Sequence, residues 1–540
     1  LIIRASSYLV CMDNEINMLP DTIDELKAMI ASLQSENKRL NRKVIILEEK
    51  IRAAFARFFS PSKDKRAAHP DDQLLLFNET EAHADTDPSR AETEAHIDAA
   101  DTTIVKEHAR RKGGKRRIPD DIPAEEIVYE LADEQKRCAC CGKSRPVIGE
   151  DKSEELDIIP AQIKKIVHVV KKYGPCACDG FLHSGEAEVK RAVKPERFIP
   201  YSIVSPGLAA YCIDYKYNYA MPYYRLSKKF EALGMDISRA TLCNWTMLAA
   251  ERCRPLYELM LGKIREGSVI NMDETRIQVL HEDGKTAESL SYMWVMKGGA
   301  ETKKLTVFQY EPSRSARTAL KLLEGFHGFL QTDGYEGYSK AVEQYQLVSV
   351  ACLAHIRRKF VDAHKANGKS KTARSGVQFI GRIYSIENRL RKKNLPPGEF
   401  AECRRKETRP VLEEFKRWLD EAGNSVLPES LSGKAVSYAL GQWERFVRFL
   451  DHPDLTPDNN TVENAIRPFA LGRKNWLFSN TPRGAESSAV LYSIVESAKN
   501  CGLPVYAYLR HLFARIPSVK TPDELETLLP CYLSTNDLKL

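Results

Sequence analysis

The chain has 540 residues, too many for a single hydrophobic core, so its length alone predicts three or more domains. Hydrophobic residues make up 43% and charged residues 29%, as in globular proteins, and no apolar run approaches the roughly 20 residues of a membrane span. The formal net charge of +7 is too small to indicate nucleic-acid binding by itself. Thirteen cysteines without an export signal predict reduced thiols or metal ligands, not disulfides, and a cytoplasmic location follows.

Residues 19–59 are predicted to form a coiled coil that joins two copies of the chain. Its first seam position holds Ile23, Ile30, Asn37, Val44 and Ile51, and its second holds Leu26, Leu33, Leu40, Leu47 and Ala54. β-Branched residues at the first position and leucine at the second favour a parallel dimer, in which Asn37 would fix the register. The alternative is one amphipathic helix packed on its own protein.

Residues 60–117 are predicted to be an acidic linker that ends in a basic arm. A Ser-Pro-Ser sequence ends the preceding helix, and the polar tract that follows has few core-forming residues. The arm contains Arg110, Arg111, Lys112, Lys115, Arg116 and Arg117. Cations separated by glycines can follow phosphates or enter a minor groove, although a solvated charge run is the commoner meaning of such tracts.

Residues 118–190 are predicted to form a small zinc-binding module. The ligands that we expect are Cys138, Cys141, Cys176 and Cys178. Two thiolate pairs suit tetrahedral Zn²⁺, and the apolar run at 164–170 predicts a strand between them. Cys140 could replace Cys141, and His168 or His183 could be the fourth ligand. Buried free cysteines are the alternative without a metal.

Residues 200–262 are predicted to be helical and to contact DNA. An amphipathic helix at 224–230 precedes a glycine that permits a sharp turn, and Ser238 is a suitable N-cap for a second helix. This order is typical of a helix-turn-helix. The second helix could lie in a major groove with Arg239 and Asn244 outward, whereas a plain helical hairpin is the alternative.

From residue 268 short apolar runs predict a mixed sheet with helices on both faces. Strands are expected at 269–272, 293–296, 305–310, 329–332 and 347–353, and helices at 316–323 and 337–343. Residues 355–450 are then expected to be almost wholly helical.

Three acidic residues of this region suit a metal site. Asp273 and Asp333 each end an apolar run that predicts a strand, and Glu463 lies in a helical stretch. Neighbouring strands would bring the two aspartates together, which is costly unless a cation neutralises them. Two Mg²⁺ or Mn²⁺ ions on these carboxylates would suit phosphoryl transfer on nucleic acid. Spacing alone is weak support in a chain with 74 acidic residues, because many of these are only solvated.

Basic residues near these carboxylates in the sequence could hold DNA. Those that we expect to do so are His355, Arg358, Lys359, Arg467, Arg473 and Lys474. His355 could bind either metal or phosphate. Glu463 and Arg467 are spaced to share one helical face with the two asparagines at 459–460.

The segments around these residues resemble the transposases of the IS66 family of bacterial insertion sequences, over nearly the whole chain. The most specific matches are Asp-Glu-Thr at 273–275, Thr-Asp-Gly-Tyr at 332–335, Ala-His-Ile-Arg-Arg-Lys-Phe at 354–360 and Asn-Asn-Thr-Val-Glu-Asn at 459–464. The heptads, the cysteine pairs and Gly-Arg-Lys-Asn-Trp at 472–476 also look like this family.

The resemblance implies a multidomain α/β plus α protein with an RNase H-like catalytic core. The core would comprise residues 263–360 and 451–500, with a helical insertion at 361–450 and a helical tail at 501–540. Its catalytic residues would be a DDE triad, which maps to Asp273, Asp333 and Glu463.

The implied activity is metal-dependent cleavage and strand transfer at the inverted repeats of a mobile element. The chain would act as a dimer or larger assembly on element ends and target DNA, in the bacterial cytoplasm and associated with the nucleoid. Companion proteins of the same element are expected. Two alternatives remain open, a zinc-containing DNA-binding regulator with an inactive core and a structure-specific nuclease.

Overall fold

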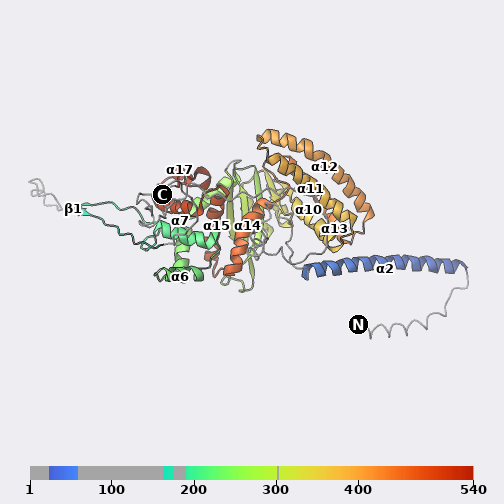
Figure 1. Cartoon of the computed structure of the whole chain (residues 1–540), viewed down its shortest axis with the longest axis horizontal. Coiled ribbons are helices and arrows are strands. Elements are labelled where there is room, and N and C mark those ends of the chain that lie inside the picture. Colours follow the sequence, from blue (N-terminus) through green and yellow to red (C-terminus); the bar gives the residue numbers. More distant parts are fainter. Residues whose placement is uncertain (1–22, 59–161, 174–189, 301–302, 539–540) are drawn as a thin grey trace, which may run out of the picture. The chain divides into compact units, whose positions relative to one another are not determined.

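The computed structural model of the chain describes residues 23–58, 162–173, 190–300 and 303–538 (Figure 1). The basic arm at 110–117 and the four expected zinc ligands therefore lie outside the described residues. Every helix and strand given below belongs to one structural unit. Within the described ranges no helix combines the length and the apolar composition that a membrane crossing needs.

The segment with the heptad pattern is one continuous helix, α2 (Ile23–Phe58). Its seam residues Ile30, Leu33, Leu40 and Leu47 are 50–59% exposed. On the flanks, Glu36 pairs with Arg39 and Glu48 with Arg52, at the spacings that stabilise a solvated helix. The helix itself agrees with the prediction. Its apolar seam is exposed, but Glu49 is buried and accepts a hydrogen bond from the Leu431 N–H (3.1 Å), so dimerisation stays a prediction and packing on its own protein stays the alternative.

The strand expected at 164–170 does not form. Residues 162–171 have no regular structure, and only β1 (Lys172–Tyr173) pairs, antiparallel, with β2 (Lys190–Arg191). Val167 and Val169 are more than two-thirds exposed. β-Branched residues favour strands chiefly when a neighbouring strand and a core cover them, and the described part of this segment has neither.

A helical region precedes the sheet. It consists of α5 (Pro206–Ile213), the π-helical turn η2 (Asp214–Asn218), α6 (Tyr223–Ala232) and α7 (Arg239–Arg265). Ser238 caps α7 as expected, because its hydroxyl accepts a hydrogen bond from the Thr241 N–H (3.1 Å). Arg239 and Asn244 are exposed, whereas Trp245 and Met260 of the same helix are buried. The helix, turn and helix therefore form, with these two polar residues outward, and their role on DNA stays a prediction.

The sheet is mixed, as predicted, and its strand order is β5-β4-β3-β6-β7. The strands are β3 (Val269–Gln278), β4 (Leu290–Gly298), β5 (Leu305–Glu311), β6 (Phe329–Thr332) and β7 (Val348–Ala351). Strand β4 is antiparallel to both of its neighbours, β3 and β5, whereas β6 is parallel to β3 and β7 is parallel to β6.

Helices pack on this sheet. Three elements connect successive strands along the chain, namely α8 (Ala316–Leu323), the 3₁₀ turn η3 (Glu336–Tyr338) and α9 (Ser339–Gln344). Three longer helices follow later in the chain, namely α14 (Asn460–Trp476), α15 (Pro482–Asn500) and α16 (Val505–Arg515). Figure 1 shows α14 and α15 against the strands. The Ser493 and Ser497 hydroxyls of α15 accept hydrogen bonds from the backbone of β5 (2.8 and 2.9 Å), which fixes this helix on the edge strand. The chain ends in the short helical turns η5 (Ile516–Ser518), α17 (Pro522–Glu526) and η6 (Pro530–Tyr532).

The expected helical block separates β7 from α14. It contains α10 (Leu353–Ala366), α11 (Lys371–Arg391), α12 (Pro397–Ser425), α13 (Leu431–Phe446) and the 3₁₀ turn η4 (Val447–Leu450). These helices enclose a second hydrophobic core, in which Phe360, Phe415 and Phe446 are fully buried. The block therefore has its own core and contacts the sheet through α13 and η4, whose Arg445 and Arg448 bind Ser349 of β7.

Candidate active site

Two of the three expected carboxylates lie side by side on neighbouring strands. β6 ends at Thr332, directly before Asp333, and pairs with β3 in a parallel register that sets Gln331 opposite Asn271. Continuing this register by two residues sets Asp333 level with Asp273. Because neighbouring strands are about 4.8 Å apart, the two carboxylates share one small region.

The structure corrects the expected position of Asp273 within its strand. This residue does not end the strand but lies midway along β3, which continues to Gln278. The cause is a hairpin in which β4 pairs with the whole second half of β3, with Val295 opposite Asp273. On its other side β3 loses its partner where β6 stops, so Asp273 lies beside the end of β6 and the residue that follows it, Asp333.

Glu463 comes to the same region from the first turn of α14. Asn459, the residue before this helix, is fully buried. Its side-chain amide donates to the Met272 carbonyl (3.0 Å), and its Oδ1 accepts from Asn271 (3.0 Å). The start of α14 is thereby bonded to the part of β3 that precedes Asp273. The expectation that Asn459 and Arg467 share one helical face is not met, because Asn459 precedes α14 and is buried while Arg467 is exposed.

The charges of the other two carboxylates act on Asp273. The pKa of Asp273 rises to about 7, mainly because the side chain is buried, and further because of the charges of Glu274, Asp333 and Glu463. A hydrogen bond from the Glu274 N–H (2.8 Å) opposes this rise. A buried carboxylate whose pKa is raised by neighbouring negative charges is best stabilised by a cation.

An arginine that the sequence did not indicate lies beside this cluster. Arg314, in the loop between β5 and α8, binds the buried Glu274 through Nε, and the Tyr338 hydroxyl donates to the other Glu274 oxygen (2.5 Å). The guanidinium stacks on Tyr335 (3.8 Å to the ring centre), and its Nη2 is 4.0 Å from Asp333 Oδ2. Arg314 thus offers a fixed positive charge at the edge of the acidic site, where it could hold a phosphate.

Of the basic residues expected to hold DNA in this region, two contact the residues of the site or of β3, and four are exposed. His355, in the first turn of α10, reaches the site, with Nδ1 4.0 Å from Glu463 Oε1. Arg473 donates to the Thr275 hydroxyl on β3 (3.2 Å) and is half-buried, and this burial lowers the pKa of its guanidinium. The remaining expected residues are exposed on α10 and α14, namely Arg358, Lys359, Arg467 and Lys474.

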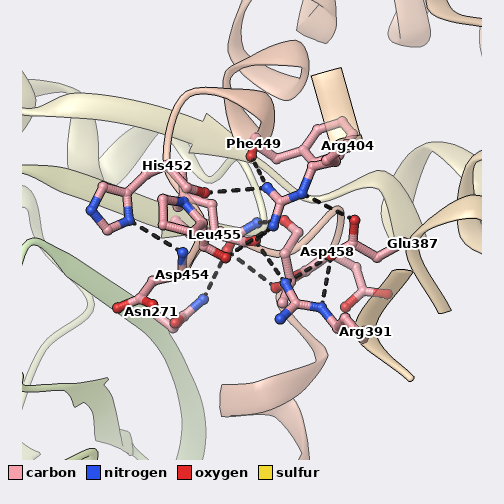
Figure 2. Close-up of polar contacts among 12 residues, drawn as sticks. Asn271, Glu387, Arg391, Arg404, Phe449, His452, Asp454, Leu455 and Asp458 are labelled. Carbon is pink, nitrogen blue, oxygen red and sulfur yellow. Dashed lines mark hydrogen bonds and ion pairs between the residues drawn. The ribbon is translucent and has the colours of Figure 1, made fainter. Parts of the chain in front are cut away.

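A buried arginine fixes the segment that leads to Glu463. Arg404 of α12 has no exposed surface, and its guanidinium pairs with Glu387 of α11 (3.2 Å) (Figure 2). Its other donors bind backbone carbonyls of the segment before α14, which are those of Phe449, His452, Pro453 and Leu455. Burial lowers the pKa of Arg404 to about 10, so the side chain stays charged at neutral pH. The helical block therefore anchors the segment that carries the third carboxylate.

The site suits hard divalent cations. Carboxylate oxygens on β3, β6 and α14 are the ligands that Mg²⁺ and Mn²⁺ prefer. Glu463 Oε1 is shielded from solvent and has no hydrogen-bond partner among the described residues, which leaves it free to bind an ion. The donor set of the site thus fits the metal that the sequence predicts.

Comparisons with known proteins match three models of one family. The Transposase IS66 family model covers residues 201–487, which include all three carboxylates. The model for the zinc-finger binding domain of transposase IS66 covers residues 135–179, which include all four expected zinc ligands, and the model for the IS66 C-terminal element covers residues 493–531.

Curated relatives carry names without a function. The chain is 34% identical over 428 residues to the uncharacterized protein y4jD of Sinorhizobium fredii, covering 76% of this chain and 81% of the relative. It is 27% identical over 537 residues to the uncharacterized protein y4qI of the same organism, covering 95% and 97%. A third relative, the uncharacterized protein y4hP, is 27% identical over 492 residues, covering 88% and 86%.

Proposed function

The chain belongs to the IS66 transposase family, and from this premise we propose that it is a DNA transposase that binds the terminal inverted repeats of an insertion sequence and catalyses metal-dependent DNA cleavage and strand transfer. The observation that carries this proposal is the convergence of Asp273, Asp333 and Glu463 from three separate elements. Each of these carboxylates lies within the family match.

The sheet topology supports an RNase H-like catalytic core. Three strands with antiparallel pairing are followed by two with parallel pairing, and β3, the first strand of this sheet along the chain, lies at its centre. The first acidic residue lies on this central strand, the second at the end of the neighbouring parallel strand and the third on a later helix. This is the arrangement that the DDE assignment requires, with the helical block inserted between the second and third residues.

Two Mg²⁺ or Mn²⁺ ions bound to the carboxylates would activate water or a DNA 3′-hydroxyl and would stabilise the leaving oxygen. The residues of the chain prepare the site for this chemistry. Asp273 must lose its proton before it can serve as a ligand, and Asn271 and Asn459 hold β3 and α14 in register. Arg314 is placed to hold a phosphate oxygen near Asp333, because Glu274 and Tyr335 fix its guanidinium.

Recognition of DNA and assembly would use the remaining parts of the chain. Zn²⁺ at Cys138, Cys141, Cys176 and Cys178 would fold the module that stands next to the basic arm. Arg239 and Asn244 on α7 would reach base edges, while the exposed cations of α10 and α14 would bind phosphates. The exposed seam of α2 would pair with a second copy, and companion proteins of the element would join the complex.

Transposition in cells tests the proposal. A reporter element with intact ends should move when the wild-type chain and its companion proteins are supplied, and Asp333→Asn should abolish this movement. Asp362→Asn, which changes an exposed carboxylate on α10, is the matched control and should retain movement. Full transposition with Asp333→Asn would show that the triad is assigned to the wrong residues.

A further inference from the structure

A second kind of donor lies within reach of the third carboxylate. The donor atoms of Cys352, His355 and Glu463 all lie within 4.8 Å of one another. Cys352 is the residue before α10, His355 lies in the first turn of that helix, and Glu463 lies in the first turn of α14. Two helix starts from either side of the inserted block therefore meet at one point.

This meeting point is held by backbone hydrogen bonds, so it does not depend on side-chain rotamers alone. The Asn459 N–H donates to Cys352 Sγ (3.1 Å), and the Leu353 N–H donates to the Pro457 carbonyl (2.9 Å). These bonds join the start of α10 to the start of α14. Mg²⁺ and Mn²⁺ prefer harder ligands than a cysteine sulfur, so the imidazole and the carboxylate are the two side chains expected to bind such an ion.

The atoms of these two side chains that could bind a metal are buried without a hydrogen-bond partner. His355 Nδ1 and Glu463 Oε1 are shielded from solvent, and neither has a hydrogen-bond partner among the described residues. They are 4.0 Å apart, too far for a hydrogen bond between them. Two buried polar atoms without hydrogen-bond partners destabilise the folded chain, so this pair calls for a bound ion or water between them.

The separation fits one metal ion. Metal–nitrogen and metal–oxygen bonds of about 2.0–2.2 Å place two ligands of one ion from about 3 Å apart at a right angle to about 4.2 Å when opposite. We propose that His355 Nδ1 and Glu463 Oε1 bind the same catalytic cation, so that one of the two metal positions has a mixed nitrogen and oxygen ligand set. This inference rests on the proposed function, and it assigns His355 to metal instead of DNA.

The mixed ligand set has a consequence for the choice of ion. An imidazole ligand favours Mn²⁺ and other transition metals over Mg²⁺, which prefers oxygen ligands. This position should therefore take Mn²⁺ in preference to Mg²⁺, while Asp273 and Asp333 supply oxygens alone. Removing the imidazole should lower Mn²⁺ affinity and leave Mg²⁺ affinity nearly unchanged.

Pulsed electron paramagnetic resonance of Mn²⁺ bound to the full-length, zinc-saturated protein tests the proposal. We expect ¹⁴N coupling from an imidazole in the wild type, its loss in His355→Gln, and a rise of at least about tenfold in the Mn²⁺ dissociation constant of that variant. His364→Gln is the matched control, because this second histidine of α10 also has a buried, unpartnered Nδ1 and should keep the coupling.

Two results would overturn the assignment. The first is ¹⁴N coupling that persists in His355→Gln. The second is Mn²⁺ that binds the wild type without ¹⁴N coupling and no longer binds in Glu463→Gln. The second result would mean that water bridges the two side chains. Strand joining without ¹⁴N coupling would refute this inference alone, whereas coupling without any DNA chemistry would support it and refute the proposed function alone.

Discussion

The buried Arg404 gives the sharpest prediction about how the helical block supports the site. Replacing it with Met keeps most of the side-chain volume, so the change mainly removes hydrogen bonds and charge. The carbonyls of Phe449, His452 and Pro453 would lose their guanidinium donor, while Leu455 and Glu387 would keep Arg391, which binds them at 3.1 and 2.7 Å.

The size of the effect follows from these contacts. Three lost hydrogen bonds at about 1 kcal/mol each give about 3 kcal/mol, and breaking a buried ion pair costs about 3–5 kcal/mol in other proteins. Since Glu387 keeps one partner, we expect the free energy of unfolding of the helical block to fall by about 3–4 kcal/mol. Strand joining should fall too, because the segment before Glu463 loses its anchor.

Urea denaturation measures this loss. Trp418 and Trp443 lie in the core of the helical block, so their fluorescence reports its unfolding. Arg409→Met changes an exposed arginine of the same helix and should leave the midpoint unchanged. A loss below about 1 kcal/mol for Arg404→Met, or an equal loss for both variants, would refute the reasoning.

Three further predictions follow from the charges, the cysteines and the heptads. Burial raises the pKa of Asp273 to about 7, above its unfolded value, so the stability that its protonation contributes is complete below about pH 4 and is lost as pH rises through 7. Asp273→Asn should therefore stabilise the metal-free protein at pH 8 by up to roughly 4 kcal/mol, with no gain at pH 4, and thermal melts at both pH values would show it. Chelation of zinc should weaken binding to element ends without changing the helix content of residues 190–538, as gel shifts and circular dichroism would record, and unchanged end binding would contradict the zinc assignment. Leu40→Glu should convert dimers to monomers in light scattering, whereas a Lys38→Glu control outside the seam should not, and monomeric wild-type protein would contradict the coiled coil.

The sequence predicts those parts of the fold that local patterns encode. The apolar runs at 305–310 and 329–332 correspond closely to β5 and β6, and the heptads correspond to α2. β3 is longer than expected because its second half is polar and becomes a strand only by pairing with β4. The run at 164–170 shows the opposite case, since its β-branched residues find no partner among the described residues.

The candidate site is predictable only in part, for the same physical reason. Asp273, Asp333 and Glu463 stand in recognisable segments, and the sheet and α14 bring the first two into register and the third close by. Arg314 and Arg404 carry no local signal, because an isolated arginine in a loop or helix is normally solvated. Their importance arises from contacts with Glu274, 40 residues earlier, and with carbonyls 45 to 51 residues later.

Strand nicking and joining by the purified protein, on a duplex that carries the end of its element, tests the central claim most directly. The reaction is run with Mg²⁺ or Mn²⁺ and with the companion proteins present, beside Glu463→Gln and a Glu444→Gln control at an exposed position on α13. We predict metal-dependent joining by the wild type and the control and none by Glu463→Gln. Equal joining by Glu463→Gln would contradict the assignment of this carboxylate to the catalytic site.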